Sequence, residues 1–228
     1  MDVAMLIFPD VTIQDFIGPY EVLTRVAEFS VSVVSPQGGE IRTEKGLQIA
    51  GTLPLADIKK TDILFIPGGA GINKLLSNSE VLSKVTELGC SARYVTSVCT
   101  GALLLAATGL LTGYRATTHW RYLDLLPEFG VQTLSDRVVI DRNRITGGGV
   151  TAGLDFALVL VAELISEDRS REIALQLEYN PAPPFNSGHP SVALPQTVAK
   201  LNAQTQESHE QRKALMQAAK QKMSLEKD

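Results

Sequence analysis

Cysteine and histidine are scarce in this chain, which has two cysteines and three histidines among its 228 residues. The histidines are scattered, and no cysteine-histidine cluster has metal-ligand spacing, so we expect no zinc site and no other bound metal or cofactor. Cys90 and Cys99 precede and end the same predicted strand, which holds them too far apart to form a disulfide. The absence of a disulfide framework favours a reducing, cytoplasmic setting.

Strong charge and long apolar runs are also absent. The formal net charge is −4 and no segment forms a basic patch, so nothing indicates binding to nucleic acid or to an anionic membrane surface. No apolar run approaches transmembrane length. Residues 1–8 are apolar but short and lack a basic leader, which predicts a first strand rather than a signal peptide.

The stretch from residue 93 to residue 111 changes abruptly from a strand pattern to a helix pattern. Residues 94–98 suit a short buried strand, and Ala and Leu dominate from Thr100 onward. Cys99 stands at the joint, where the backbone is often strained and the free amides of a helix N-terminus favour a thiolate. Gly101 would let a substrate approach. The alternative is that Cys99 is simply a small buried residue.

Strands and helices alternate along the rest of the chain, which with 44% hydrophobic residues predicts one sizeable α/β domain around a central, mostly parallel sheet. We expect a small hairpin over residues 40–50 and a helix that becomes regular after Pro19. Strands are predicted at residues 3–8, 29–35, 62–66 and 94–98, a short strand or turn at 116–120, and a strand-turn-strand over 136–145. One or two helices are predicted over 72–88, and further helices at 101–111, 121–126, 154–165, 169–179 and from 191 onward.

Several polar residues and glycines follow predicted strands, where ligands bind in open α/β sheets. Asp15 follows the first strand, and the glycine loop at residues 67–71 could expose backbone amides to an anion. His119 should come close to Cys99. Each has a structural alternative. Asp15 could be an ordinary loop carboxylate, the glycine loop could be only a turn, and His119 could be a structural, hydrogen-bonded histidine beside the only tryptophan. For Asp155, within a predicted helix, we favour an anchoring role over chemistry.

Three motifs carry a family resemblance that covers about the first 180 residues. They are residues 96–102 (TSVCTGA), 115–120 (RATTHW) and 146–157 (TGGGVTAGLDFA). In these the chain resembles the DJ-1/PfpI superfamily, both its isocyanide hydratase group and the amino-terminal domain of AraC-type regulators. Residues 14–19 (QDFIGP) and 177–185 (LEYNPAPPF) are similar to the hydratases specifically. The polar tail leaves no room for the DNA-reading domain of the regulators.

The resemblance implies a flavodoxin-like three-layer sandwich and a hydratase that adds water to isocyanides. Cys99 would be the nucleophile and Asp15 the general acid and base, with no cofactor and a small-molecule substrate. Residues contacting the substrate or stabilising an anion would be Thr100, Gly68, Gly69, Gly148, Val150 and His119.

The resemblance also implies a catalytic domain over residues 1–190, a helical extension over 191–228 that packs on the body or on a partner, and a homodimer. Thr100 stands where the protease-like branch carries a histidine, and Asp15 where the DJ-1 branch carries a glutamate. Two alternatives remain open: a glyoxalase or deglycase-like activity on reactive carbonyls, and a non-catalytic redox sensor with an exposed, low-pKa Cys99.

Overall fold

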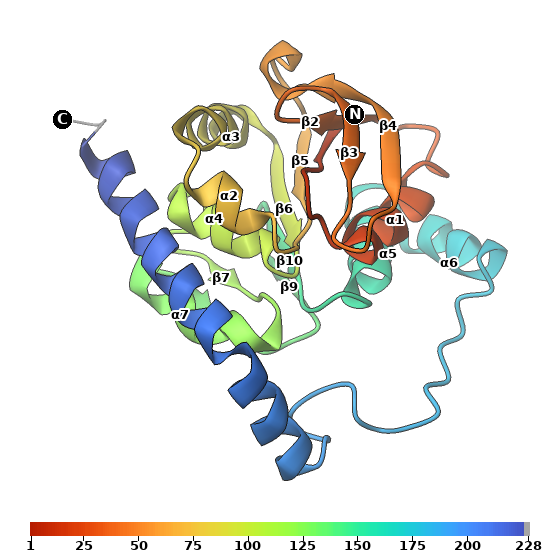
Figure 1. Cartoon of the computed structure of the whole chain (residues 1–228). Coiled ribbons are helices and arrows are strands. Elements are labelled where there is room, and N and C mark those ends of the chain that lie inside the picture. The colour runs from red at the N-terminus through yellow and green to blue at the C-terminus, as the bar shows by residue number, and fades with distance from the viewer. Residues whose placement is uncertain (226–228) are drawn as a thin grey trace.

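An eight-stranded sheet runs through the centre of the computed structural model, which describes the backbone of residues 1–225 and the side chains of residues 1–222 (Figure 1). The strand order is β3-β4-β2-β1-β5-β6-β10-β9, and only the outermost strands β3 and β9 run antiparallel to their neighbours. The strands are β1 (Asp2–Leu6), β2 (Ser30–Ser35), β3 (Gly39–Arg42), β4 (Gln48–Pro54), β5 (Ile63–Ile66), β6 (Tyr94–Val98), β9 (Val138–Asp141) and β10 (Arg144–Gly147), with a separate small pair of β7 (Arg115–Ala116) and β8 (Gln132–Thr133).

Helices cover both faces of this sheet, so the predicted three-layer α/β architecture is confirmed. In Figure 1, α1, α5 and α6 lie on one side, and α2, α3, α4 and α7 lie on the other. The helices are α1 (Ile13–Leu23), α2 (Ile72–Leu76), α3 (Ser79–Ser91), α4 (Gly101–Ala107), α5 (Ala152–Leu164), α6 (Glu167–Gln176) and α7 (Pro195–Leu225), with short 3₁₀ helices η1 (Leu55–Asp57), η2 (Trp120–Leu125) and η3 (Pro127–Phe129).

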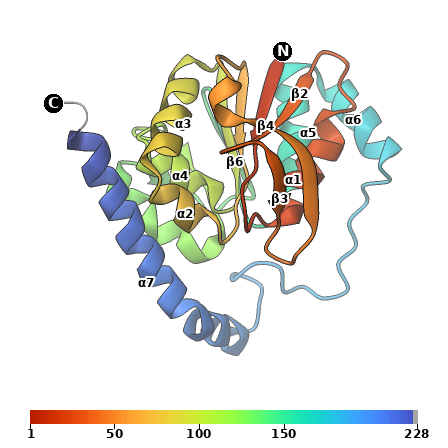
Figure 2. The same cartoon turned by 45° about the horizontal axis from the view of Figure 1, so that its top comes forward.

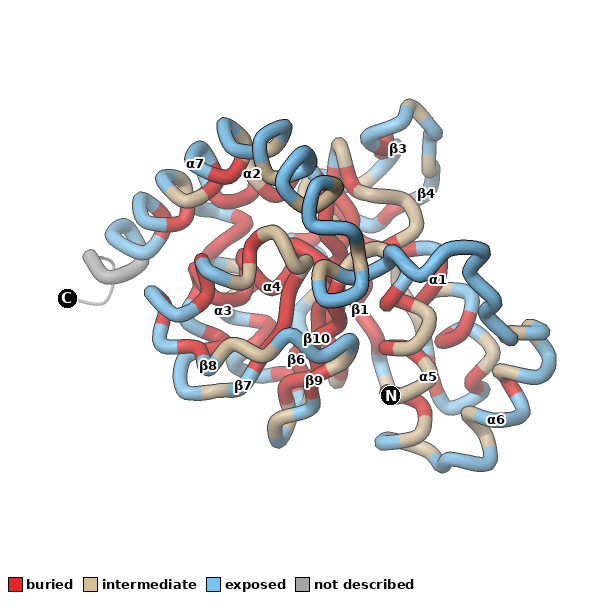
Figure 3. Tube along the Cα trace, turned by 90° about the horizontal axis from the view of Figure 1, so that it is seen from below, coloured by how far each residue is buried: buried red, intermediate tan, exposed pale blue. Residues whose placement is uncertain are grey.

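The core lies along the four central strands. Residues 3–8 and 63–66 are all buried, as Figure 3 shows by the red tubes through the middle of the molecule. A strand covered by helices on both faces has no solvent side, and this explains why these segments are continuously apolar rather than alternating. The parallel arrangement brings the carboxyl ends of β1, β5 and β6 to one edge.

The first helix begins earlier than the sequence predicts. It starts at Ile13 and continues through Pro19, so Asp15 lies in its first turn, the second of the two places expected for it, a loop or an entry turn. Pro19 stands inside the helix, where it has no amide hydrogen to donate to the carbonyl of Asp15.

The connector between α6 and α7 runs outside the packed elements in both Figure 1 and Figure 2. Residues 181–189 are all exposed, as expected of the proline-rich segment, and the chain then forms the single long helix α7. Within α7, Met216 and Ala219 are buried, whereas the side chain of Met223 and residues 226–228 lie outside the described residues. The division into units at residue 190 stays a prediction. Up to Leu225, the chain contains no helix with the length and apolar character needed to cross a membrane.

Candidate active site

Cys99 occupies a sharp turn between β6 and α4. Its φ angle is 56°, in the left-handed region that residues with a side chain rarely adopt, so the predicted strain at the joint is confirmed. Backbone bonds hold this conformation: the Cys99 amide donates to the carbonyls of Gly147 (3.1 Å) and Gly148 (2.8 Å). The hydroxyl of Thr118 donates to the Cys99 carbonyl at 2.7 Å. The neighbouring strand β10 and the Thr118 loop therefore fix the orientation of the cysteine.

Gly101 permits close packing rather than substrate approach. A Cβ atom at this position would lie 2.1 Å from the carbonyl oxygen of Ile66 at the end of β5. The first turn of α4 can pass this close to β5 only because residue 101 has no side chain. The space that the sequence assigned to a substrate is filled by backbone.

Asp15 is fully buried beside Cys99. Its Oδ2 accepts a hydrogen bond from the Gly68 amide at 2.9 Å, while Oδ1 has no hydrogen-bond partner in the structure. Burial raises the pKa of this carboxyl to about 7, against the opposing effects of the Cys99 side chain and the Gly68 amide. A carboxyl with this pKa holds its proton in a large fraction of molecules near neutrality, which suits a general acid.

The glycine loop after β5 holds the two polar side chains of the site. The Gly69 amide donates to Thr100 Oγ1 at 3.0 Å, just as the Gly68 amide donates to Asp15. A Cβ on Gly68 would lie 2.7 Å from both Asp15 Oδ2 and Thr100 Oγ1. Both glycine amides are therefore engaged in positioning Asp15 and Thr100, and the Thr100 amide is the one that interacts with the Cys99 sulfur.

Burial and the adjacent Asp15 oppose ionisation of the Cys99 thiol. Both raise its pKa, whereas the Thr100 amide and the cation of Arg212 act in the opposite direction. The thiolate that the helix amides favour therefore stays a prediction, and desolvation of the anion acts against it.

Arg212, on the last helix, reaches this site and was missed at the sequence level. It is 4% exposed, and its Nη2 donates to the Gly69 carbonyl at 3.4 Å. A signal existed: the buried positions Met216 and Ala219 continue at helical spacing back to Arg212 and His209, which are buried on the same stripe. Because two of the four residues on that stripe are polar, a search for apolar positions at helical spacing does not detect the stripe.

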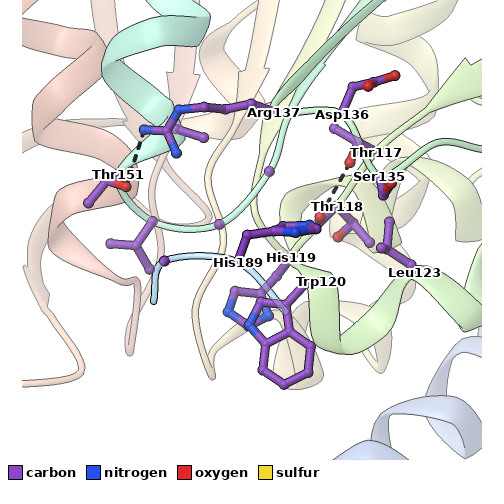
Figure 4. A pocket seen from close by; sticks show the side chains of 15 residues that line it. Thr117, Thr118, His119, Trp120, Leu123, Ser135, Asp136, Arg137, Thr151 and His189 are labelled. Carbon is purple, nitrogen blue, oxygen red and sulfur yellow. Dashed lines mark hydrogen bonds between the residues drawn. The ribbon is translucent and has the colours of Figure 1, made fainter. Parts of the chain in front are cut away.

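A cavity of about 490 Å³ lies beside the backbone of the turn (Figure 4). Gly148, Val150 and His119 line it, whereas Cys99 and Asp15 do not. In Figure 4, Arg137 and Thr151 lie on one side of the cavity, and Trp120 and Leu123 lie on another. The predicted site residues therefore form two groups, with Cys99, Asp15, Thr100, Gly68 and Gly69 around the thiol and His119, Gly148 and Val150 around the cavity.

His119 faces this cavity as a neutral imidazole. Burial lowers its pKa to about 4, with the nearby charges of Arg212 and Arg121 acting in the same direction. Its Nδ1 accepts the Arg121 amide at 3.2 Å, so the ring proton resides on Nε2. His119 can therefore donate a hydrogen bond but cannot act as a proton source near neutrality.

Asp155 is an anchor, as its position in the sequence suggested. Its carboxylate accepts from Arg137 Nε at 2.7 Å and from the Tyr179 hydroxyl at 3.0 Å. These contacts tie α5 to the loop before β9 and to the end of α6, away from the thiol. Among residues 1–225 there is no cluster of three or more histidine, cysteine or acidic side chains that would hold a metal ion.

Comparison with known proteins places this chain in a family. Residues 1–163 match the model of the DJ-1/PfpI family. The chain is 42% identical to the isonitrile hydratase of Pseudomonas putida over 225 residues, which cover 99% of each protein. It is 31% identical to the glutathione-independent glyoxalase DJR-1.2 of Caenorhabditis elegans over 135 residues, 58% of this chain and 72% of that protein.

A solved structure shares both the fold and much of the sequence. The crystal structure of a ThiJ/PfpI family protein from Pseudomonas syringae aligns with a TM-score of 0.91 and 38% identity. The alignment covers 94% of this chain and 90% of the other. Because the coverage extends well past residue 163, the likeness includes part of the chain beyond the family match.

Proposed function

The chain belongs to the DJ-1/PfpI family, and on that basis we propose that it is an isocyanide hydratase, which converts an isocyanide and water into an N-substituted formamide. The observation that carries the proposal is the buried pair of Cys99 and Asp15, which interact at the strained turn. A polarisable nucleophile beside a carboxyl that is half protonated near pH 7 matches what hydration of an isocyanide requires.

In the first step, the Cys99 sulfur attacks the terminal carbon of the isocyanide. A carbon–sulfur bond forms, and the carbon takes a proton from the Asp15 carboxyl while the thiol proton passes to the carboxylate. The product is a thioimidate bonded to Cys99, and the pair has given one proton to the substrate carbon while Asp15 is protonated again. Asp15 Oδ1, which has no partner in the structure, is free to make this transfer.

In the second step, water adds to the thioimidate carbon. Asp15 donates its proton to the imine nitrogen and takes a proton from the water, which gives a tetrahedral intermediate. The carbon–sulfur bond then breaks, the formamide leaves, and the proton returns to the sulfur, so that one water and one isocyanide are consumed per cycle. Thr100, held by the Gly69 amide, would orient the water. His119 Nε2 and Val150 would contact the substituent.

The test follows formamide formation from cyclohexyl isocyanide. Wild type should turn over, Cys99→Ala should lose at least roughly a thousandfold of the rate, and Asp15→Asn should lose roughly a hundredfold or more. Cys90→Ala is the matched control, since Cys90 is an exposed cysteine on α3, and it should keep full activity. No turnover by wild type would refute the assignment, and full turnover by Cys99→Ala would refute the mechanism.

A glyoxalase is the second candidate, because the Caenorhabditis elegans relative carries that name. A thiol and a carboxyl can also act on an aldehyde carbon. Lactate formation from methylglyoxal, measured beside isocyanide hydration, separates the two activities. The redox-sensor alternative requires an exposed thiolate, whereas Cys99 is 4% exposed and burial raises its pKa, so this structure gives it no support.

A further inference from the structure

Two side chains of the last helix, His209 and Arg212, pack on Tyr122 of η2. The ring of His209 stacks on that of Tyr122, with centroids 5.7 Å apart, and the guanidinium of Arg212 lies 4.5 Å from the Tyr122 centroid. His209 also bonds to Asp124 at 3.0 Å. These contacts fix the position of α7 against η2. They therefore also fix the position of the Arg212 side chain.

Arg212 is held on the glycine loop by two further contacts. Its Nε donates to Asn73 Oδ1 at 2.7 Å, and its Nη2 donates to the carbonyl of Gly69, whose amide in turn holds Thr100. Among the described residues, no carboxylate forms an ion pair with Arg212, although the side chain is 4% exposed. A buried cation without an anionic partner is costly, and such an arrangement is typical of a site where an anion forms during the reaction.

We propose that Arg212 is a positioning residue for the hydration reaction, which stabilises the Cys99 thiolate as it forms and fixes the Gly69 turn that holds Thr100. That the reaction is a hydration rests on the proposed function. That Arg212 belongs to the site rests on the geometry of α7. Arg212 does not line the cavity and need not touch the substrate. The extension beyond the family match therefore completes the site instead of merely covering it.

The charges around the thiol agree with this role. Asp15 on α1 raises the Cys99 pKa, and Arg212 on α7 lowers it. Glu44, after β3, acts on Asp15 and on Arg212, and His119 is neutral near pH 7. Arg212 is thus the cation that offsets the cost of forming a sulfur anion in a buried site.

The test measures the pH dependence of Cys99 alkylation by iodoacetamide in a Cys90→Ser background, which removes the other thiol. Arg212→Met should move the alkylation midpoint upward by about one pH unit, equivalent to a roughly tenfold slower reaction at a fixed pH below it. The alkylation midpoint of Arg212→Lys should lie between those of wild type and Arg212→Met. Lys213→Met is the control. Lys213 is next to Arg212 in the sequence but forms an ion pair with Glu128, so the alkylation profile of this variant should match that of wild type.

Circular dichroism verifies that each variant is folded. Asn73→Ala provides a second route, since it removes the Nε acceptor but keeps the charge, and should shift the midpoint in the same direction by less. If Arg212→Met folds and its alkylation profile is unchanged, the proposal is overturned. If Arg212→Met does not fold, an unchanged alkylation profile in Asn73→Ala overturns it. In hydration assays Arg212→Met should lower kcat with little change in KM. A shifted alkylation profile without any isocyanide turnover by wild type would refute only the hydratase assignment.

Discussion

At the scale of single residues, the burial of Asp15 carries a cost in stability. One of its oxygens is satisfied by the Gly68 amide, and the other is buried without a partner. The folded protein keeps this carboxyl protonated to about pH 7, whereas an unfolded chain would release the proton near 3.8. Folding is therefore opposed at neutral pH by a group that the proposed chemistry requires.

Asp15→Asn should stabilise the protein, and more so at higher pH. The folded-state pKa is raised, so the wild type loses stability as the pH rises from about 4 to about 7, and a neutral amide avoids that loss. The gain at pH 8 should be on the order of 2 to 4 kcal/mol, at about 1.4 kcal/mol per pKa unit. Urea unfolding at pH 4 and pH 8 measures it.

Asp168→Asn is the control for this measurement, since the Asp168 side chain is 88% exposed. It should show no comparable pH-dependent gain. Equal stability of Asp15→Asn and wild type at pH 8 would contradict the raised pKa.

Residue by residue, the sequence predicts what local patterns encode. Cys99 could be identified because strand and helix compositions meet at that position, and Asp15 because it follows a buried strand. The charge state of Cys99 could not be predicted, since it depends on how deeply the whole fold buries the sulfur. Arg212 lies 113 residues after Cys99 in the chain, and only the path of α7 brings them together.

At the scale of elements, the site depends on how closely α4 approaches the end of β5. Gly101 faces the Ile66 carbonyl, and Gly68 leaves the space that Asp15 and Thr100 occupy. Composition predicted these elements well, because helix and strand formers are segregated along the chain. The exception is α1, for which the sequence predicts a regular helix only after Pro19, whereas the helix begins at Ile13.

Gly101→Ala should destabilise the fold. The new methyl group would meet the Ile66 backbone, which cannot move without distorting β5, and overpacking of this kind costs roughly 1 to 3 kcal/mol. Gly188→Ala is the matched control, because no atom lies within 4 Å of the added Cβ, and it should be neutral. Urea midpoints for both variants check this, and equal midpoints would contradict the close approach.

At the scale of the whole molecule, the connector before α7 is exposed throughout residues 181–189. Phe185 is 79% exposed and Leu194 is 61% exposed, and Leu175 at the end of α6 is 83% exposed. Large apolar side chains left exposed in this way are available to contact another chain. This is consistent with the homodimer implied by the family resemblance, which stays a prediction.

We expect sedimentation velocity to give the mass of two chains at micromolar concentration. Phe185→Ser should shift the equilibrium between dimer and single chain toward the single chain, because it removes the largest exposed apolar side chain of the connector. A single-chain mass for wild type over the whole concentration range would contradict the dimer. An unchanged dimer in Phe185→Ser would place the contact elsewhere on the surface.

The position of Arg212 on the final helix has a consequence for biosynthesis. All other residues of the proposed site lie before α5, so the sheet and its thiol can assemble while α7 is still emerging from the ribosome. Until that helix docks, Cys99 lies in the same turn beside Asp15 but lacks the cation that favours its anion. The nascent chain would therefore carry a less reactive cysteine, and the thiol would reach its full reactivity only after α7 has docked.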